Sequence, residues 1–215
     1  MIKAVLFDFD GTLINTNDLI FKSYEVAFQE VFNRKIEMDE ILTLYGKPLY
    51  SSLMQYGNED GERLYRIYRE YNETNHDLLA KPFDGVFEGI NKLSENGYKL
   101  GIVTSKRSRM VLRGIDILNL NGVFDAIITP DDTKETKPHP EPVLCGCERL
   151  GICPEEAIYV GDSIFDLAAG QAANTKLCAV SYSVTPKKEL MEYNPDYFVN
   201  SIAELADILG ECVCR

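Results

Sequence analysis

The sequence lacks any apolar run of transmembrane length, and its first residues pass directly into a short strand pattern instead of a signal-peptide segment. Positive charge is also scarce, because 22 Lys and Arg residues stand against 34 Asp and Glu residues and give a formal net charge of -12. Such an acidic chain is a poor partner for nucleic acid and for anionic membrane surfaces. We therefore expect a cytoplasmic protein with neither kind of partner, and a small anionic substrate only where cations are concentrated locally.

Cysteine pairs with the usual zinc-site spacing are missing as well. The six cysteines include two C-x-C pairs but no C-x-x-C pair. Residues two positions apart in a helix point to different sides, so a C-x-C pair in a helix is poorly placed to share a metal. We predict free thiols and no structural metal. The cysteines are Cys145, Cys147, Cys153, Cys178, Cys212 and Cys214.

Five short apolar runs recur along the chain, each with the length and composition of a strand buried on both faces. Helical patterns lie between them, such as Val86–Glu95 before Gly97, Pro142–Leu150 before Gly151, and a final helix that opens at a capping box from Ser201. This alternation predicts an α/β fold with a doubly wound, Rossmann-like parallel sheet. The predicted strands are Ala4–Phe7, Leu100–Val103, Ala126–Ile128, Ile158–Val160 and Cys178–Val180.

One interval breaks the alternation, because residues 16–81 contain several helical patterns and no convincing strand. We predict that residues 1–15 and 82–215 form the α/β core domain and that residues 16–81 form an inserted helical cap. The insert leaves the core just after the first strand. We therefore expect it over the carboxyl edge of the sheet, where ligands bind in such folds.

The first predicted strand delivers two carboxylates, Asp8 and Asp10, to a glycine turn. This arrangement favours phosphoryl transfer, in which Asp8 attacks phosphorus and forms an aspartyl phosphate. Asp10 would protonate the leaving oxygen and later deprotonate the water that frees the enzyme. Taken alone, an Asp-x-Asp pattern is more typical of a capped turn, so the interpretation depends on the rest of the chain.

Further polar residues lie at or beyond the other predicted strands, namely Thr104, Lys137, Asp162 and Asp166. Each has an ordinary alternative, a helix cap for the threonine and the aspartates and a solvated surface position for the lysine. Because the carboxyl ends of parallel strands meet at one edge of a sheet, however, all four can share a pocket with Asp8.

The residue types in this pocket match the needs of a phosphoryl group. The Thr104 hydroxyl can donate to a phosphate oxygen, and the backbone N–H groups of Ser105 and Lys106 can form a small anion nest. Lys137 would neutralise the charge that the nucleophile and the phosphoryl group share. The aspartates would repel one another unless a hard cation lay among them, and an oxygen-only ligand set is the one that Mg²⁺ prefers.

In this order the motifs resemble those of the haloacid dehalogenase-like (HAD) superfamily, which has a DxDGT first motif, a Ser/Thr second, a Lys third and an acidic fourth. The resemblance covers almost the whole chain, and a helical insert after the first motif is typical of the C1-capped phosphatase branch. It implies a Mg²⁺-dependent phosphohydrolase, with Asp8 and Asp162 binding the metal through side chains and Asp10 through its backbone carbonyl. Asp166 would support these ligands without binding the metal itself.

Within the superfamily, several stretches resemble the inorganic pyrophosphatases, among them Gly11–Asn17 and Asn194–Tyr197. This resemblance implies hydrolysis of pyrophosphate, including pyrophosphate released when serine-phosphorylated HPr is dephosphorylated by phosphorolysis. The sibling phosphoglycolate phosphatases, or another phosphatase of small phosphomonoesters, remain alternatives. So does a catalytically silent module that binds phosphate.

Selectivity for pyrophosphate requires donors for its distal phosphate. The glycine-and-proline turn of the predicted cap carries Lys47, which would bind this phosphate when the cap closes. A solvent-facing lysine is the alternative.

Overall fold

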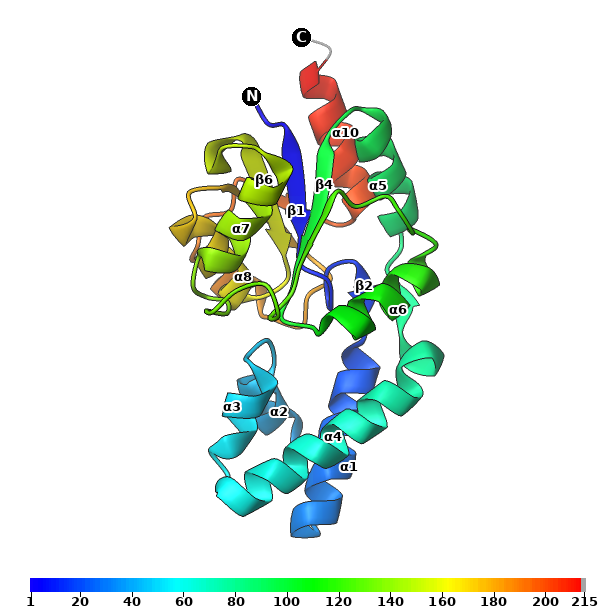
Figure 1. Ribbon diagram of the computed structural model, residues 1–215, viewed down its shortest axis with the longest axis vertical. Helices are drawn as coiled ribbons and strands as arrows, with labels where there is room; N and C mark the ends of the chain where they lie inside the picture. Colours follow the sequence, from blue (N-terminus) through cyan, green and yellow to red (C-terminus); the bar gives the residue numbers. More distant parts are fainter. Residues whose placement is uncertain (214–215) are drawn as a thin grey trace. The chain divides into compact units, whose positions relative to one another are not determined.

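The computed structural model describes the backbone of residues 1–213 and the side chains of residues 1–210 (Figure 1). The chain divides into two compact units, residues 1–15 with the chain from residue 81 onward, and residues 16–80. Within the described chain, none of the helices combines the length and the apolarity that a membrane span requires. A cytoplasmic location stays a prediction.

A parallel sheet forms the centre of the first unit, as predicted, and it has six strands. The strand order runs outward in both directions from β1, and the winding reverses between β1 and β6. In doubly wound sheets this reversal is the place where ligands bind, at the carboxyl ends of the strands. In spatial order the strands are β5 (Ala126–Ile128), β4 (Lys99–Val103), β1 (Ala4–Phe7), β6 (Ala157–Gly161), β7 (Lys176–Val180) and β8 (Tyr197–Val199).

All five predicted strands are present, and the sequence analysis missed only the edge strand β8 of this sheet. The four residues of β1 are fully buried, as expected for a strand covered on both faces. β8 has three residues and two of them are only partly buried, so it carries no continuous apolar run. Short edge strands of this kind leave little pattern to detect.

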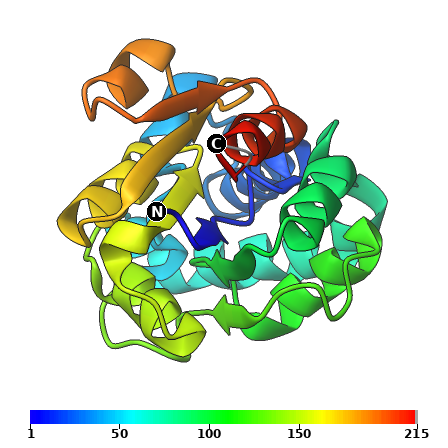
Figure 2. The same ribbon diagram turned by 90° about the horizontal axis from the view of Figure 1, so that it is seen from above.

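Helices cover both faces of the sheet (Figures 1 and 2). α7 (Glu141–Leu150) and α8 (Ile164–Ala172) pack on one face, whereas α5 (Val86–Glu95) and α10 (Ile202–Val213) pack against each other on the opposite face. The layers therefore bury both faces of the sheet and leave its carboxyl edge to carry polar groups. The remaining helical elements of this unit are α6 (Ser108–Leu118), η1 (Pro154–Glu156) and α9 (Lys187–Met191).

The helix ends follow the sequence signals. α5 has the predicted bounds, and α7 ends at Gly151, which adopts a left-handed conformation with φ of 65°. At the start of α10 the Ser201 hydroxyl accepts from the Glu204 N–H at 3.1 Å, as a capping residue does. The Glu204 carboxylate accepts from the Asn200 N–H at 2.6 Å, one residue earlier than a capping box requires.

A small two-stranded ladder lies where the chain leaves the α/β unit and returns to it. β2 (Ile14–Asn15) pairs in antiparallel fashion with β3 (Lys81–Pro82), so the chain leaves and re-enters the α/β unit side by side. Lys81 pairs with Asn15 in this ladder and therefore belongs to the α/β unit.

The helical unit has a core rich in aromatic residues. The rings of Tyr24 and Tyr68 meet edge to face with centroids 4.7 Å apart, and Phe28 and Tyr56 do so at 5.0 Å. These contacts join its helices around one apolar cluster. The helices are α1 (Asn17–Phe32), α2 (Met38–Leu44), α3 (Leu49–Met54) and α4 (Asn58–Leu79).

Four of the six cysteines lie among the described side chains, and all four are free thiols as predicted: Cys145, Cys147, Cys153 and Cys178. Burial raises the pKa of the Cys147 thiol to about 11, so it stays a thiol at neutral pH. Cys212 and Cys214 lie outside the described side chains.

Candidate active site

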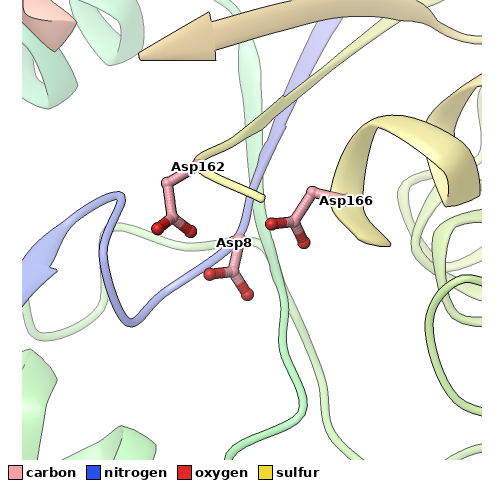
Figure 3. A group of neighbouring side chains, drawn as sticks. All are labelled: Asp8, Asp162 and Asp166. Carbon is pink, nitrogen blue, oxygen red and sulfur yellow. The ribbon is translucent and has the colours of Figure 1, made fainter. Parts of the chain in front are cut away.

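Three carboxylates converge beyond the carboxyl ends of β1 and β6 (Figure 3). Asp8 follows β1 and Asp162 follows β6, and the two strands pair directly, with the Asp8 N–H donating to the Val160 carbonyl at 2.8 Å. Asp166 comes from the first turn of α8. One oxygen from each aspartate lies within 4.8 Å of the others, and all three residues are buried. The reversal point of the sheet therefore holds a compact acidic cluster.

Lys137 is the counter-charge of this cluster. Its ammonium donates to Asp8 Oδ1 at 2.5 Å and to Asp166 Oδ1 at 2.6 Å. It also lies 3.2 Å from the Tyr159 hydroxyl and 3.4 Å from the Val103 carbonyl oxygen. Its side chain is only 6 % exposed, so Lys137 lies inside the site and the alternative of a solvated surface lysine does not apply.

The protonation of the cluster reflects an excess of negative charge. Burial, with further contributions from the Asp166 and Asp10 carboxylates, raises the pKa of Asp8 to about 7 in spite of Lys137. Burial, with contributions from the Asp166, Asp8 and Asp10 carboxylates, raises the pKa of Asp162 well above its ordinary value. Burial alone would lower the pKa of Lys137, but Asp166 and Asp8 outweigh it and raise that pKa. One ammonium is therefore insufficient to balance the aspartates.

The second predicted motif lies at the end of β4. The Thr104 N–H donates to the Ile128 carbonyl at 3.0 Å, which fixes the backbone, and Thr104 Oγ1 accepts from the Lys106 N–H at 3.1 Å. Ser105 between them is exposed. The Lys106 N–H thus contacts the threonine hydroxyl, and the predicted anion nest of Ser105 and Lys106 stays a prediction.

The Lys106 side chain extends to the first motif. Its ammonium lies 2.6 Å from Asp10 Oδ1 and 5.7 Å from the centroid of the Phe9 ring. Asp10 therefore forms an ion pair with a lysine of the second motif. Asp8 instead forms an ion pair with Lys137 of the third motif, which also pairs with Asp166 of the fourth.

Gly11 is required by the geometry of the first motif. Its φ of +85° is a left-handed conformation that side chains disfavour, and a Cβ atom there would lie 2.3 Å from Asp162 Oδ2. Only glycine lets the turn after Asp10 approach the Asp162 carboxylate this closely.

The family model for haloacid dehalogenase-like hydrolases matches residues 5–180. The chain belongs to this family. The resemblance inferred from the motifs is thereby confirmed, as is the prediction that the protein is an enzyme, at the level of a hydrolase.

Relatives of this hydrolase extend over its whole length. A Clostridium perfringens protein named "Putative pyrophosphatase PpaX" is 43% identical over 209 residues, which cover 97% of this chain and 98% of that protein. A Bacillus cereus protein named "Pyrophosphatase PpaX" is 37% identical over 210 residues, with 98% and 97% covered. A solved structure of a haloacid dehalogenase-like hydrolase from Streptococcus pneumoniae superposes with a TM-score of 0.85 at 25% identity, covering 97% of this chain and 98% of that one.

Two polar residues of this hydrolase's site were missed by sequence reasoning. The buried Tyr159 hydroxyl donates to the Val103 carbonyl at 3.0 Å and lies 3.2 Å from both Asp166 Oδ1 and the Lys137 ammonium. Its position inside an apolar strand gave no signal that its hydroxyl turns toward the lysine. Ser163 was detectable, because Ser-x-x-Asp is a capping pattern.

Ser163 fixes the Asp166 carboxylate. Its hydroxyl and its backbone N–H both donate to Asp166 Oδ2, at 2.5 and 3.1 Å. Because Asp166 Oδ1 accepts from Lys137, both oxygens of this carboxylate are held by protein donors. Asp166 is therefore oriented more firmly than a capping residue alone would be.

Lys47 belongs to the helical unit, on the turn between α2 and α3, where it is exposed. Its predicted contact with substrate stays a prediction.

Proposed function

We propose that this hydrolase is a Mg²⁺-dependent phosphatase that acts through an aspartyl phosphate on Asp8 and hydrolyses inorganic pyrophosphate. The observation that carries the proposal is the position of Asp8, buried beside Asp162 with its Oδ1 held at 2.5 Å by Lys137. A carboxylate fixed in this way is aimed by its neighbours and needs little reorganisation before attack.

In the first step an Asp8 oxygen forms a bond to phosphorus while the bond from phosphorus to the leaving oxygen breaks. The electron pair of the broken bond goes to the leaving oxygen, which takes a proton from Asp10. Lys137 stabilises the charge on the nucleophile and on the transferring group, and the Thr104 hydroxyl donates to a phosphoryl oxygen.

In the second step water attacks the phosphorus of the aspartyl phosphate. Asp10 now accepts the proton of that water, the bond from phosphorus to the Asp8 oxygen breaks, and its electron pair returns to the carboxylate. For pyrophosphate the two steps consume one water and release two phosphates.

The acidic cluster fits Mg²⁺. Its donors are all oxygen, and the raised pKa values of Asp8 and Asp162 mark carboxylates whose charge the protein alone leaves unbalanced. Asp8 and Asp162 side chains and the Asp10 carbonyl would hold the ion. When bound, Mg²⁺ supplies positive charge to the phosphoryl oxygens and brings the substrate to the nucleophile.

Asp166 would act by orienting the neighbouring side chains of the site, above all Lys137. Both of its oxygens already accept hydrogen bonds from Lys137 and Ser163, which favours a supporting part over direct ligation.

Pyrophosphate as substrate is supported by the names of the two full-length relatives at 43% and 37% identity. The substrate is a small phosphorylated anion, and Lys47 is the cation of the helical unit that we assign to its distal phosphate. The link to the HPr phosphorylation cycle rests on resemblance alone and stays a prediction.

Phosphate release by the purified protein tests the proposal. We expect kcat/KM for pyrophosphate with Mg²⁺ to exceed that for phosphoglycolate, sugar phosphates and nucleotides. A clear preference for phosphoglycolate would show that pyrophosphate is the wrong substrate but would leave the proposed mechanism intact. Phosphate release that survives Asp8→Asn would show that the proposed mechanism is wrong.

A further inference from the structure

We propose that Lys106 binds the negative charge of the leaving group and so makes the enzyme selective for substrates whose leaving group is an anion. This inference rests on the proposed function, in which Asp10 is the acid. It concerns the side chain of Lys106, which sequence reasoning included only for its backbone N–H.

The Lys106 ammonium is held in place. It lies 2.6 Å from Asp10 Oδ1, its side chain is only 10 % exposed, and it passes 5.7 Å from the centroid of the Phe9 ring. Phe9 is itself fully buried against Gly114 of α6, where a Cβ atom would lie 2.5 Å from the ring. Surface lysines lose much rotamer freedom when they are ordered, whereas here the packing has already restricted the side chain.

The position of Asp10 determines which part of the substrate Lys106 faces. A general acid must come within hydrogen-bond distance of the leaving oxygen. Because the Lys106 ammonium contacts that same carboxylate, it lies on the leaving-group side of the site. Lys137 lies on the nucleophile side of the site instead, since it contacts the nucleophile Asp8 and also Asp166.

This division separates two kinds of substrate. When the bond from phosphorus to the oxygen of an uncharged alkyl group breaks, the proton from Asp10 neutralises the oxygen and no charge remains to be bound. When pyrophosphate is cleaved, the leaving phosphate keeps charge on its other oxygens after it receives the proton. A carboxylate on the leaving group, as in phosphoglycolate, has the same need. A fixed ammonium beside Asp10 meets it with a charged hydrogen bond.

The test compares two lysine variants with different positions. Lys106→Met removes the proposed contact and keeps an unbranched apolar side chain close to the length of the lysine stem. Lys176→Met is the matched control, because Lys176 forms a similar pair with Asp196 at 2.7 Å, but at the start of β7, far along the strand from the carboxyl edge, with its side chain 53 % exposed. Both variants lower the net charge of the chain by the same amount.

We expect Lys106→Met to lower kcat/KM for pyrophosphate about 100-fold and that for propyl phosphate, whose leaving group is a neutral alcohol, by less than about threefold. Lys176→Met should leave both values unchanged. Imidodiphosphate, a pyrophosphate analogue with a nitrogen bridge, should inhibit Lys106→Met at least about tenfold more weakly than the parent enzyme, and Lys106→Arg should recover most of the loss.

Equal losses on the two substrates would assign Lys106 to the support of Asp10 and overturn the proposal, as would an unchanged kcat/KM for pyrophosphate. The substrate itself is tested separately by phosphoglycolate. If the parent enzyme cleaves phosphoglycolate and not pyrophosphate, the proposed substrate is wrong, and Lys106→Met must then lower phosphoglycolate turnover about 100-fold for the proposal to stand. Thermal melting of Lys106→Met together with its Arg counterpart shows whether either variant has lost its fold.

Discussion

Two groups of paired charges in this molecule have opposite electrostatic character. In the helical unit the Glu40 carboxylate accepts from both terminal nitrogens of Arg34, at 2.9 and 2.7 Å, and from the Tyr56 hydroxyl at 2.9 Å. These donors, Arg34 above all, hold the pKa of Glu40 below its ordinary value. In the α/β unit the pKa values of Asp8 and Asp162 are raised instead.

The difference shows in which of the two groups the protein's own side chains balance the charge. Every acceptor of the Glu40 pair has a protein donor nearby, so its charge favours the fold. Of the three clustered aspartates, Asp8 and Asp166 share the Lys137 ammonium, and burial further disfavours negative charge on the cluster. Groups with such perturbed pKa values are concentrated at functional sites, where a ligand supplies the missing charge. The comparison therefore predicts that changes in the cluster affect activity and that changes in the pair affect only stability.

The largest effect is expected for Asp8→Asn. This change keeps the shape of the side chain but removes the nucleophile, so kcat should fall at least about a thousandfold, or roughly 4 kcal/mol of transition-state stabilisation. Because one of the repelling carboxylates is also removed, the melting temperature of the metal-free protein should rise. Steady-state phosphate release and thermal melting measure the two effects.

Glu40→Gln is the control from the other unit. It should leave kcat unchanged and lower the free energy of unfolding by less than about 1 kcal/mol, as expected for a partly exposed ion pair. A kcat for Asp8→Asn above a tenth of the parent value, or a large loss of activity in Glu40→Gln, would contradict the division of these residues into a catalytic cluster and a stabilising ion pair.

Removal of the metal should have the next largest effect. We expect activity to fall at least about a hundredfold in excess chelator and to return with Mg²⁺. Ca²⁺ should inhibit, because it accepts more ligands at longer distances and can draw both Asp8 oxygens into coordination. Titration calorimetry should show that Asp162→Ala weakens Mg²⁺ binding more than Asp166→Ala does, and the reverse order would exchange the parts assigned to these two aspartates.

The pH dependence of stability offers a third comparison. Asp8 has a pKa of about 7 in the folded protein, above its ordinary value of 3.8, so the folded state binds more protons between these values. The metal-free protein should therefore lose stability, on the order of 3 kcal/mol, as pH rises from about 4 to about 7. Denaturant unfolding at a series of pH values measures this loss, which millimolar Mg²⁺ should reduce. Stability that rises steadily over this interval without metal would contradict the account of the cluster.

The smallest effect is expected for Lys47→Ala in the helical unit. If Lys47 binds the distal phosphate, KM for pyrophosphate should rise about tenfold, which corresponds to roughly 1.4 kcal/mol, while hydrolysis of p-nitrophenyl phosphate stays nearly unchanged. Initial-rate kinetics on both substrates decide this point. Equal effects on both, or none on either, would exclude Lys47 from the specificity of the enzyme.

The sheet was predictable from the sequence because its central strands are buried on both faces and therefore read as continuous apolar runs. The same signal fails at β8, which is short and half-buried, and at the two-residue strands β2 and β3, which are stabilised by the antiparallel ladder between distant parts of the chain. Pairing of this kind depends on the tertiary fold and leaves no local pattern.

The site was predictable to the extent that it lies at strand ends. The positions of Asp8, Asp162 and Lys137 follow from the motifs and the topology of the sheet. The contact between Lys106 and Asp10 joins residues 96 positions apart through a flexible side chain, and the Tyr159 hydroxyl turns inward from a strand whose pattern is purely apolar. Side-chain directions of this kind are decided by packing, which sequence spacing does not encode.

In the proposed mechanism Asp8 becomes phosphorylated during turnover, and rapid acid quenching can trap this intermediate. The enzyme is mixed with Mg²⁺ and pyrophosphate, quenched within one turnover, digested and examined by peptide mass spectrometry. We expect a phosphoryl group on Asp8 that appears before free phosphate reaches its steady rate of release and is absent from Asp8→Asn. Phosphate release in the first turnover with no phosphorylated Asp8 at any time would contradict this mechanism.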